Sequence, residues 1–350
     1  MLHTFRADER FRRHIDRGLD QLKRELDLRQ VATIEANTLS APDAEAHPGG
    51  SKLCLKMRDA EGQLFLFKQA EPALAAAEEA AYALRQLGGR PGLPARVLEL
   101  DLGARGVSGG VLRPFLELEH DTELDSDTTR WSVEQRAVML LEHAWEWFLD
   151  NMDTNTSQYV LAGPLRVPLN MDWDRAFASA ATSELSRFAK YKPTLPNART
   201  FLYADYVAGK IKLPLWLLAA EARRIRRLPK AAVRRILERY ARARFSDASE
   251  QEHFVRRVLM RRHGIEREVG HLLRTSWAER RALGGPPANL RERLHHALLL
   301  LWGDWQLVLN RVLRGPIGRW GRRLLSFTRQ IRARLRSVSG AREQNPGSAH

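Results

Sequence analysis

Residues 165–177, LRVPLNMDWDRAF, place two carboxylates in a phrase that is otherwise typical of a short buried strand. A second short strand, SQYVL, precedes it, and two further aspartates, Asp150 and Asp153, lie just before that strand. An unpaired charge beside a buried strand is costly. The grouping therefore argues against a plain Asx-rich turn and predicts a functional role for Asp172 and Asp174.

The residues before this stretch have the pattern of a small β-sheet crossed by one helix. An Ala-rich segment, residues 72–89, begins at Pro72 and ends with two glycines, the usual placing of these residues at helix ends. The expected strands flank it in two pairs joined by turn residues: KLCLKM with QLFLFKQ, and ARVLELDL with VLRPFLEL. An earlier strand is expected in QVATIEANTL, and an amphipathic helix over residues 1–30.

The residues after 120 are mainly helical in period. A long helix is expected over residues 133–151, and nearly everything beyond Glu184 has helical spacing, with Pro-containing breaks. A chain of 350 residues is long enough for two lobes. These patterns predict an α+β protein with a small β-rich part followed by a larger helical part.

The β-rich part contains candidates for two of the groups that phosphoryl transfer from ATP requires, a phosphate cover and a lysine on the phosphates. Glycine lets a backbone approach phosphate oxygens, so HPGGS, with Gly49, Gly50 and Ser51, is the candidate cover. The candidate lysine is Lys68, at the end of the strand FLFK. Glu78, on the following helix, is expected to hold Lys68 by an ion pair.

The remaining groups lie in and beside the aspartate stretch. Asp153 follows the long helix and precedes the strand SQYVL, where a group that orients or deprotonates the acceptor hydroxyl would lie. Asp172 ends the next strand, where a Mg²⁺-binding carboxylate would lie. Asp174 has two interpretations, a second metal ligand or a helix cap.

The order of these stretches resembles the atypical kinase superfamily that includes the phosphatidylinositol 3/4-kinase-like, HipA-like and CotH-like kinases. GGSKLCLKMRDAEGQLFLFKQAEP resembles their glycine loop and lysine strand, and EEAAY their REVAAY helix. SGGVLRPFLE resembles the hairpin that leads to the adenine-binding hinge. NMDTNTSQYVL resembles their N-x-D-R-H-x-x-N-x-L catalytic loop, and DWDRAF their D-x-D-x-A-F metal motif.

The resemblance implies a bilobal protein-kinase-like fold with a small β-rich N-lobe containing one helix and a larger, mainly helical C-lobe. The implied parts are an N-terminal helix at 1–30, the N-lobe at 31–120, the C-lobe at 121–275, a basic helical extension at 276–340 and a disordered tail at 341–350. The implied activity is an ATP- and Mg-dependent phosphotransferase acting on a hydroxyl of a protein, a lipid or a small molecule.

The resemblance also assigns a role to each candidate residue. Asp153 is the catalytic residue. The nucleotide-binding residues are Gly49, Gly50, Ser51, Lys68, Glu78, Arg113 and Phe115, and the metal ligands are Asp172, Gln158 and Asp174.

Three residues depart from the family pattern. Thr154 and Asn155 stand where family members carry Arg-His, and Gln158 stands where they carry a metal-binding Asn. The extra methylene of Gln158 shifts its oxygen, and Mg²⁺ tolerates poor geometry badly, so Asn155 is an alternative ligand. The departures leave open a nucleotide-binding pseudokinase that serves as a scaffold or a regulatory binding module.

Positive charge is concentrated in the second half of the chain. The net charge is +15, and from Glu184 onward lie 36 of the 57 Lys and Arg but only 13 of the 42 Asp and Glu. Such a basic region is a solvated helix face, an anionic membrane contact or a nucleic-acid surface. Interleaved Trp and Leu favour the membrane, so we expect two basic amphipathic helices over residues 290–336 that dock on anionic lipid.

The remaining composition bears on location. A single cysteine, Cys54, excludes an internal disulfide framework and a multi-cysteine metal site. The first residues carry charge throughout and lack the apolar region of a secretory signal. We therefore expect a cytoplasmic protein, peripheral on the inner face of a membrane where the basic extension docks.

Overall fold

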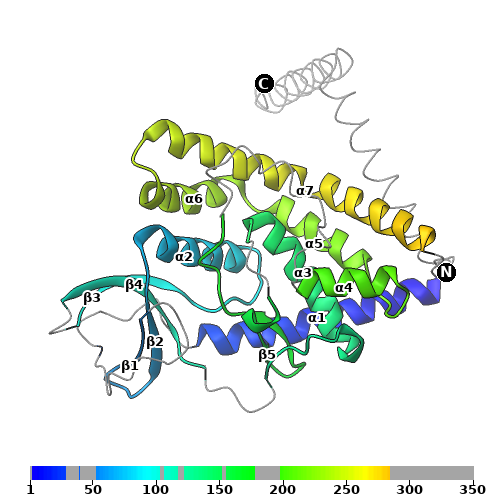
Figure 1. Ribbon diagram of the computed structural model, residues 1–350, viewed down its shortest axis with the longest axis horizontal. Coiled ribbons are helices and arrows are strands. Elements are labelled where there is room, and N and C mark those ends of the chain that lie inside the picture. The colour runs from blue at the N-terminus through cyan, green and yellow to red at the C-terminus, as the bar shows by residue number, and fades with distance from the viewer. Residues whose placement is uncertain are drawn as a thin grey trace, which may run out of the picture. The chain divides into compact units, whose positions relative to one another are not determined.

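The computed structural model describes residues 2–28, 39, 53–102, 106–116, 122–151, 155–177 and 198–283. The chain divides into two units, Met1–Asn289 and Leu290–His350, and every described residue belongs to the first (Figure 1). The expected strand over residues 30–39, the basic segment over 290–336 and the tail at 341–350 lie outside the described residues, apart from residue 39.

A four-stranded antiparallel sheet forms one part of this unit. Its strands are β1 (Cys54–Arg58), β2 (Leu64–Gln69), β3 (Arg96–Asp101) and β4 (Val107–Pro114), in the order β1-β2-β4-β3. β2 and β4 lie so close that a Cβ atom on Gly110 would come within 2.4 Å of the Lys68 carbonyl oxygen. Glycine is therefore required at this point of β4.

Helix α2 (Pro72–Leu87) connects β2 to β3 and packs on the sheet. Proline begins the helix, and Gly89 follows it with a φ of 67°, a left-handed conformation that glycine adopts without strain. The opposite face of the sheet buries a separate apolar cluster made of Leu55, Met57, Phe65, Phe67, Leu98, Leu100 and Leu112. Successive side chains of each strand thus alternate between the face that α2 covers and the face that carries this cluster.

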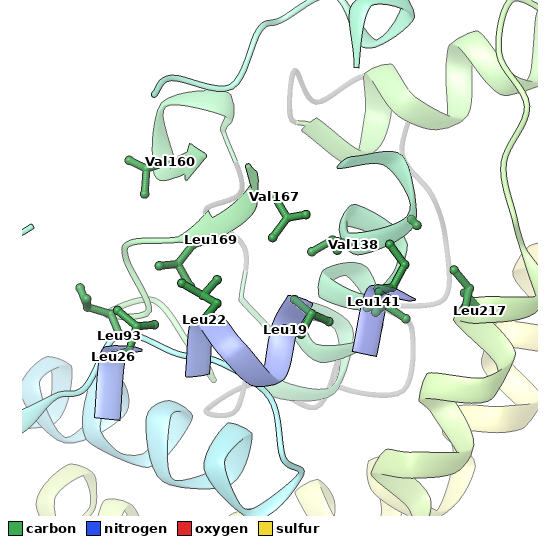
Figure 2. Close-up of a cluster of buried hydrophobic side chains, with 12 residues drawn as sticks. Leu19, Leu22, Leu26, Leu93, Val138, Leu141, Val160, Val167, Leu169 and Leu217 are labelled. Carbon is green, nitrogen blue, oxygen red and sulfur yellow. The ribbon is translucent and has the colours of Figure 1, made fainter. Parts of the chain in front are cut away.

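The amphipathic first helix, α1 (Leu2–Asp27), packs through one apolar face against the helical part of the unit. Its Ile15, Leu19, Leu22 and Leu26 are buried at helical spacing. They meet residues of α3 (Val133–Leu149), of α5 (Trp216–Arg227), and of the hairpin formed by β5 (Tyr159–Ala162) and β6 (Val167–Asn170) (Figure 2). This core holds the hairpin that leads into the aspartate stretch.

The remaining described elements are helical. They are η4 (Thr128–Arg130), η5 (Thr156–Gln158), α4 (Ala198–Val207), α6 (Lys230–Arg244) and α7 (Ala248–Ala282). α3 begins with a capping box, in which Ser132 and Gln135 satisfy each other's backbone N–H groups. α2 packs on the sheet on one side and on α6 on the other, and α6 packs on α7 (Figure 1).

The prediction of a mixed α+β protein with a small antiparallel sheet and several helices is confirmed. The helix over residues 1–30 and the strands on either side of the Ala-rich helix are also found. The boundary expected at residue 275 falls inside α7, which continues without a break to Ala282. None of the helices described has the length and apolar character needed to cross a bilayer.

Candidate functional site

Lys68, at the end of β2, is the centre of a buried group of charged side chains. Its Nζ atom donates to Glu78 Oε1 at 3.1 Å, to the two Asp172 oxygens at 2.9 and 3.0 Å, and to Asp174 Oδ2 at 3.1 Å. An ammonium group has three N–H donors, so each carboxylate receives one of them. The three carboxylates come from positions 10, 104 and 106 residues away in the chain.

The sheet and α2 place the first two of these groups. Lys68 pairs with Val111 on β4 and has a side chain that is 7% exposed. Glu78 lies on the buried face of α2 and is 3% exposed. The predicted ion pair between Lys68 and Glu78 is therefore present, and both charges are removed from solvent.

A tight turn after β6 places the two aspartates. Asn170 Oδ1 accepts a hydrogen bond from the backbone N–H of Asp172 at 2.9 Å, and Asp172 Oδ1 accepts one from the N–H of Asp174 at 3.2 Å. The N–H of Phe177 donates to the carbonyl of Leu149 at 2.6 Å, which fastens the end of the turn to the end of α3. Asp174 thus holds Lys68.

Arg113 adds a second cation to the group. Its Nη1 atom lies 3.3 Å from Glu78 Oε2 and donates to the carbonyl of Met171. We call Lys68, Glu78, Arg113, Asp172 and Asp174 the Lys68 cluster. With all groups ionised, it contains three negative and two positive charges.

The pKa values of Glu78 and Lys68 are both raised, for different reasons. Burial raises the pKa of Glu78 despite the opposing charges of Arg113 and Lys68. Burial and the charge of Arg113 act to lower the pKa of Lys68. The charges of Glu78, Asp172 and Asp174 outweigh these two effects, and the pKa of Lys68 is raised. Both groups therefore hold their protons more firmly than in water, Glu78 because of burial and Lys68 because of the carboxylates around it.

An open cavity of about 610 Å³ borders the cluster. Its polar lining includes Arg113, Gln158 and Asp172. The rest of the lining is mostly apolar, with one lysine: Lys56, Leu66, Leu93, Pro114, Phe115, Leu116 and Met171. The volume lies within the range of about 300–1,000 Å³ found for small-molecule sites, and an apolar lining with a few converging polar groups is their usual composition.

The carboxylates of the cluster have the arrangement of a cation site. One oxygen from each of Glu78, Asp172 and Asp174 lies within 4.8 Å of the others. Carboxylate oxygens are the ligands that Mg²⁺ prefers, and Gln158 adds an amide beside Asp172 at the same cavity. The residues therefore fit a divalent cation, which would share the carboxylates with the Lys68 ammonium.

The structure brings together most of the predicted site residues that it describes. Lys68, Glu78, Arg113, Asp172 and Asp174 form one cluster, and Phe115 and Gln158 line the cavity beside it. Phe115 also carries the Lys56 ammonium over its ring, 4.4 Å from the centroid. Gly49, Gly50, Ser51, Asp153 and Thr154 lie outside the described residues.

Some contributions to the site were not foreseen. Glu78 was expected only to hold Lys68, yet its carboxylate also belongs to the candidate cation site. Asn151 donates from Nδ2 to the carbonyl of Asp172 at 3.4 Å, which links the two aspartate segments. A fully buried Asn after a helix end was the available signal for such a tie.

A second buried ionic group lies away from the cavity. Arg90 donates from both ends of its guanidinium to Glu221, including Nε to Oε1 at 2.7 Å, and from Nη1 to Asp16 at 2.9 Å. Trp145 Nε1 also donates to Glu221 at 2.7 Å, and Arg224 lies 3.3 Å from it. We call these five residues the Arg90 cluster, which joins α1, α3 and α5 to the loop after α2.

Comparisons with protein-family models, with curated proteins and with solved structures found no match to this chain. The assignment of a function to the Lys68 cluster therefore depends on the chemistry and geometry of its own residues.

Proposed function

We propose that the protein is an ATP- and Mg-dependent phosphotransferase with a bilobal kinase-like arrangement, in which the sheet and α2 form the smaller lobe. The observation that carries the proposal is the convergence of Lys68, Glu78, Asp172 and Asp174 beside an open cavity. These are the types of group that phosphoryl transfer from ATP needs: a lysine for the phosphates and carboxylates for the metal.

The proposed roles follow from position. Asp172 and Asp174, with Gln158 at the cavity, would hold Mg²⁺, which neutralises charge on the phosphates. Lys68 would turn part of its hydrogen bonding from the carboxylates to the phosphates. Glu78 would keep the Lys68 ammonium charged and oriented, since a buried lysine without a carboxylate loses its proton readily. Asp153 is proposed to orient the acceptor hydroxyl.

The cavity supports a nucleotide as the phosphate donor. Its apolar lining residues, among them Leu66, Leu93 and Leu116, offer a surface for a flat base, while Asp172 in the same lining contacts Lys68. A ligand lying along the cavity would therefore bring an anionic end to the Lys68 cluster. We propose the cytoplasm as the place of action, with contact to a membrane surface through the basic C-terminal segment.

The test is transfer of phosphate from ATP by the purified full-length protein with Mg²⁺. Asp172→Asn and Lys68→Met are expected to lower the rate at least a hundredfold, because each removes a charge that acts on the phosphates or the metal. Glu134→Gln, at the half-buried first turn of α3 and not among the residues that line the cavity, serves as the matched control and should retain the rate. A rate that is equal in all four proteins would reject the proposal.

A nucleotide-binding pseudokinase is the second candidate function. The observation that favours it is Gln158 at the cavity, where the pattern of active kinases has the shorter Asn. Such a protein would be stabilised by ATP and Mg²⁺ but would transfer no phosphate to water or to added acceptors. Gln158→Asn is then expected to tighten Mg²⁺-dependent ATP binding, which calorimetry would measure.

A further inference from the structure

A second open cavity, of about 410 Å³, lies between α6 and α7 and has a strongly basic lining. Four cations, Lys230, Arg234, Arg256 and Arg262, face it, against one carboxylate, Glu252. The other lining residues are Leu259, Met260 and His263. None of these residues belongs to the Lys68 cluster or to the cavity beside it.

Two of the four cations are already oriented by their own contacts. Arg234 donates from Nε to Glu238 at 2.6 Å and also pairs with Glu252. Arg262 donates from Nη1 to the carbonyl of Arg226 at 2.9 Å. Burial and then the charge of Arg226 lower the pKa of Arg262, so this guanidinium lies in surroundings that are short of negative charge.

The other two cations have no acidic partner in the described part of the chain. Lys230 and Arg256 are exposed at the cavity, and neither forms an ion pair with any residue of the described ranges. After the pairing of Arg234 with Glu252, three positive charges at the cavity remain for a ligand. A concave surface of one sign concentrates counter-ions of the opposite sign.

Apolar groups border the same cations. The Met260 side chain is among the exposed large apolar side chains of the described residues, at 67% exposure, and Leu259 beside it is half-buried. Exposed apolar and basic groups side by side are typical of surfaces that bind at the boundary between lipid head groups and acyl chains. Among the residues that the structure describes, none of those lining this cavity is a Phe, Tyr or Trp on which nucleic-acid bases would stack.

We propose that the α6–α7 cavity binds the phosphate head group of an anionic phospholipid, with Met260 contacting the acyl boundary of the bilayer. Lys230 and Arg256 supply the free positive charges, and Arg234 and Arg262 give the cavity its fixed donors. This site is separate from the basic segment over residues 290–336 and from the proposed phosphotransferase activity.

The test is co-sedimentation of the full-length protein with phosphatidylcholine vesicles, with and without one part in five of phosphatidylglycerol, at physiological salt. The double variant Lys230→Gln/Arg256→Gln is expected to partition about 30-fold less onto anionic vesicles, because each cation near an anionic leaflet contributes about fivefold. The matched control is Arg235→Gln/Arg239→Gln, which removes two exposed charges of α6 that do not line the cavity. The control should fall by less than about fivefold.

Met260→Gln provides an independent readout. It leaves every charge in place and removes apolar contact area, so vesicle binding should fall at least about threefold. Binding of glycerol 3-phosphate, followed by thermal shift, should not change in this variant. All three variants alter exposed positions and are expected to retain the unfolding midpoint of the wild type.

Three results would overturn the proposal. The first is an equal fall in the double variant and its control, which would mean diffuse charge attraction. The second is vesicle binding that the double variant retains while binding of glycerol 3-phosphate is lost, which would mean a soluble phosphate ligand. The third is vesicle binding that the double variant retains while binding of a single-stranded oligonucleotide is lost, which would mean a nucleic-acid site.

Discussion

The Lys68 cluster and the Arg90 cluster are both buried, and both join segments that are far apart in the chain, yet they differ in charge and in space. The Arg90 cluster contains two carboxylates and two guanidinium groups, and the space beside Arg90 and Glu221 has no volume for a water molecule. The Lys68 cluster has one carboxylate in excess and borders an open cavity.

The two buried glutamates respond in opposite directions. Burial acts to raise the pKa of Glu221, but the charge and hydrogen bonds of Arg90, with Arg224 and Trp145, lower it below the usual value. In the Lys68 cluster burial prevails, and the pKa of Glu78 is raised. Breaking a balanced and filled cluster destabilises the fold, whereas an unbalanced cluster at a cavity leaves room for a cationic ligand.

The largest effect is expected from Arg90→Met. The substitution leaves the buried Glu221 and the partly buried Asp16 without their main partner, so the free energy of unfolding should fall by about 3–5 kcal/mol. Urea unfolding would measure it. The control Lys23→Met breaks a partly exposed i,i+4 pair on α1 and should cost at most about 1 kcal/mol. Equal losses in the two variants would contradict a structural role for the Arg90 cluster.

Lys68→Met is expected to destabilise in a manner that a metal ion reverses. The substitution removes the ammonium partner of the three carboxylates, and without divalent cations no other positive charge replaces it. Mg²⁺ can take that place, and at a hundredfold its Kd it would return about 2.7 kcal/mol to the free energy of unfolding. Urea unfolding in EDTA and in Mg²⁺ would measure this return. Arg90→Met, in which Lys68 still holds the three carboxylates, should gain less stability than Lys68→Met from the same change of buffer. A Lys68→Met protein whose free energy of unfolding is the same in EDTA and in Mg²⁺ would count against a cation site.

The pH dependence of stability should separate the two glutamates. A raised pKa in the folded state means that Glu78 contributes stability below pH 4.5 that is lost as the pH rises towards its folded pKa. A lowered pKa means that Glu221 contributes stability above pH 4.5 that is lost as the pH falls. When the free energy of unfolding is measured from acid to neutral pH, its decline above pH 4.5 should therefore be smaller in Glu78→Gln than in the wild type. Glu221→Gln should instead flatten the acid limb, and an exchange of the two patterns would refute the assignment.

The smallest effect on stability is expected from Asp172→Asn. Removing one carboxylate balances the Lys68 cluster, so the free energy of unfolding should stay the same or rise by up to about 1 kcal/mol, as is common when a site residue is given up. Thermal unfolding without Mg²⁺ would measure it. A loss as large as that of Arg90→Met would mean that Asp172 is a structural residue.

The sequence predicted the elements better than the way they come together. Local signals marked the ends of α2 at Pro72 and Gly88, and apolar spacing marked α1, so these helices were predictable. The charged phrase around Asp172 indicated a site because an apolar strand end tolerates no unpaired carboxylate. The prediction that Asp172 lies near Lys68 came from the order of the motifs along the chain and not from any local pattern.

The Arg90 cluster was not predicted at all. Arg90, Glu221 and Asp16 each lie in segments where charged residues are common. Only the packing of three helices buries Arg90 and Glu221 and partly covers Asp16. Arg113 was expected near the adenine hinge, but it also pairs with Glu78 because β4 turns that side chain toward α2. Contacts of this kind depend on tertiary packing, which a local pattern does not specify.

The most direct test of the account is calorimetric titration of the full-length protein with ATP, with and without Mg²⁺, beside Asp172→Asn and Lys23→Met. We expect wild type and Lys23→Met to bind ATP with Mg²⁺ and to bind it at least tenfold more weakly without Mg²⁺, whereas Asp172→Asn should lose this dependence. Absence of ATP binding in the wild type, or binding that is the same with and without Mg²⁺, would contradict the assignment of the Lys68 cluster as a metal-nucleotide site.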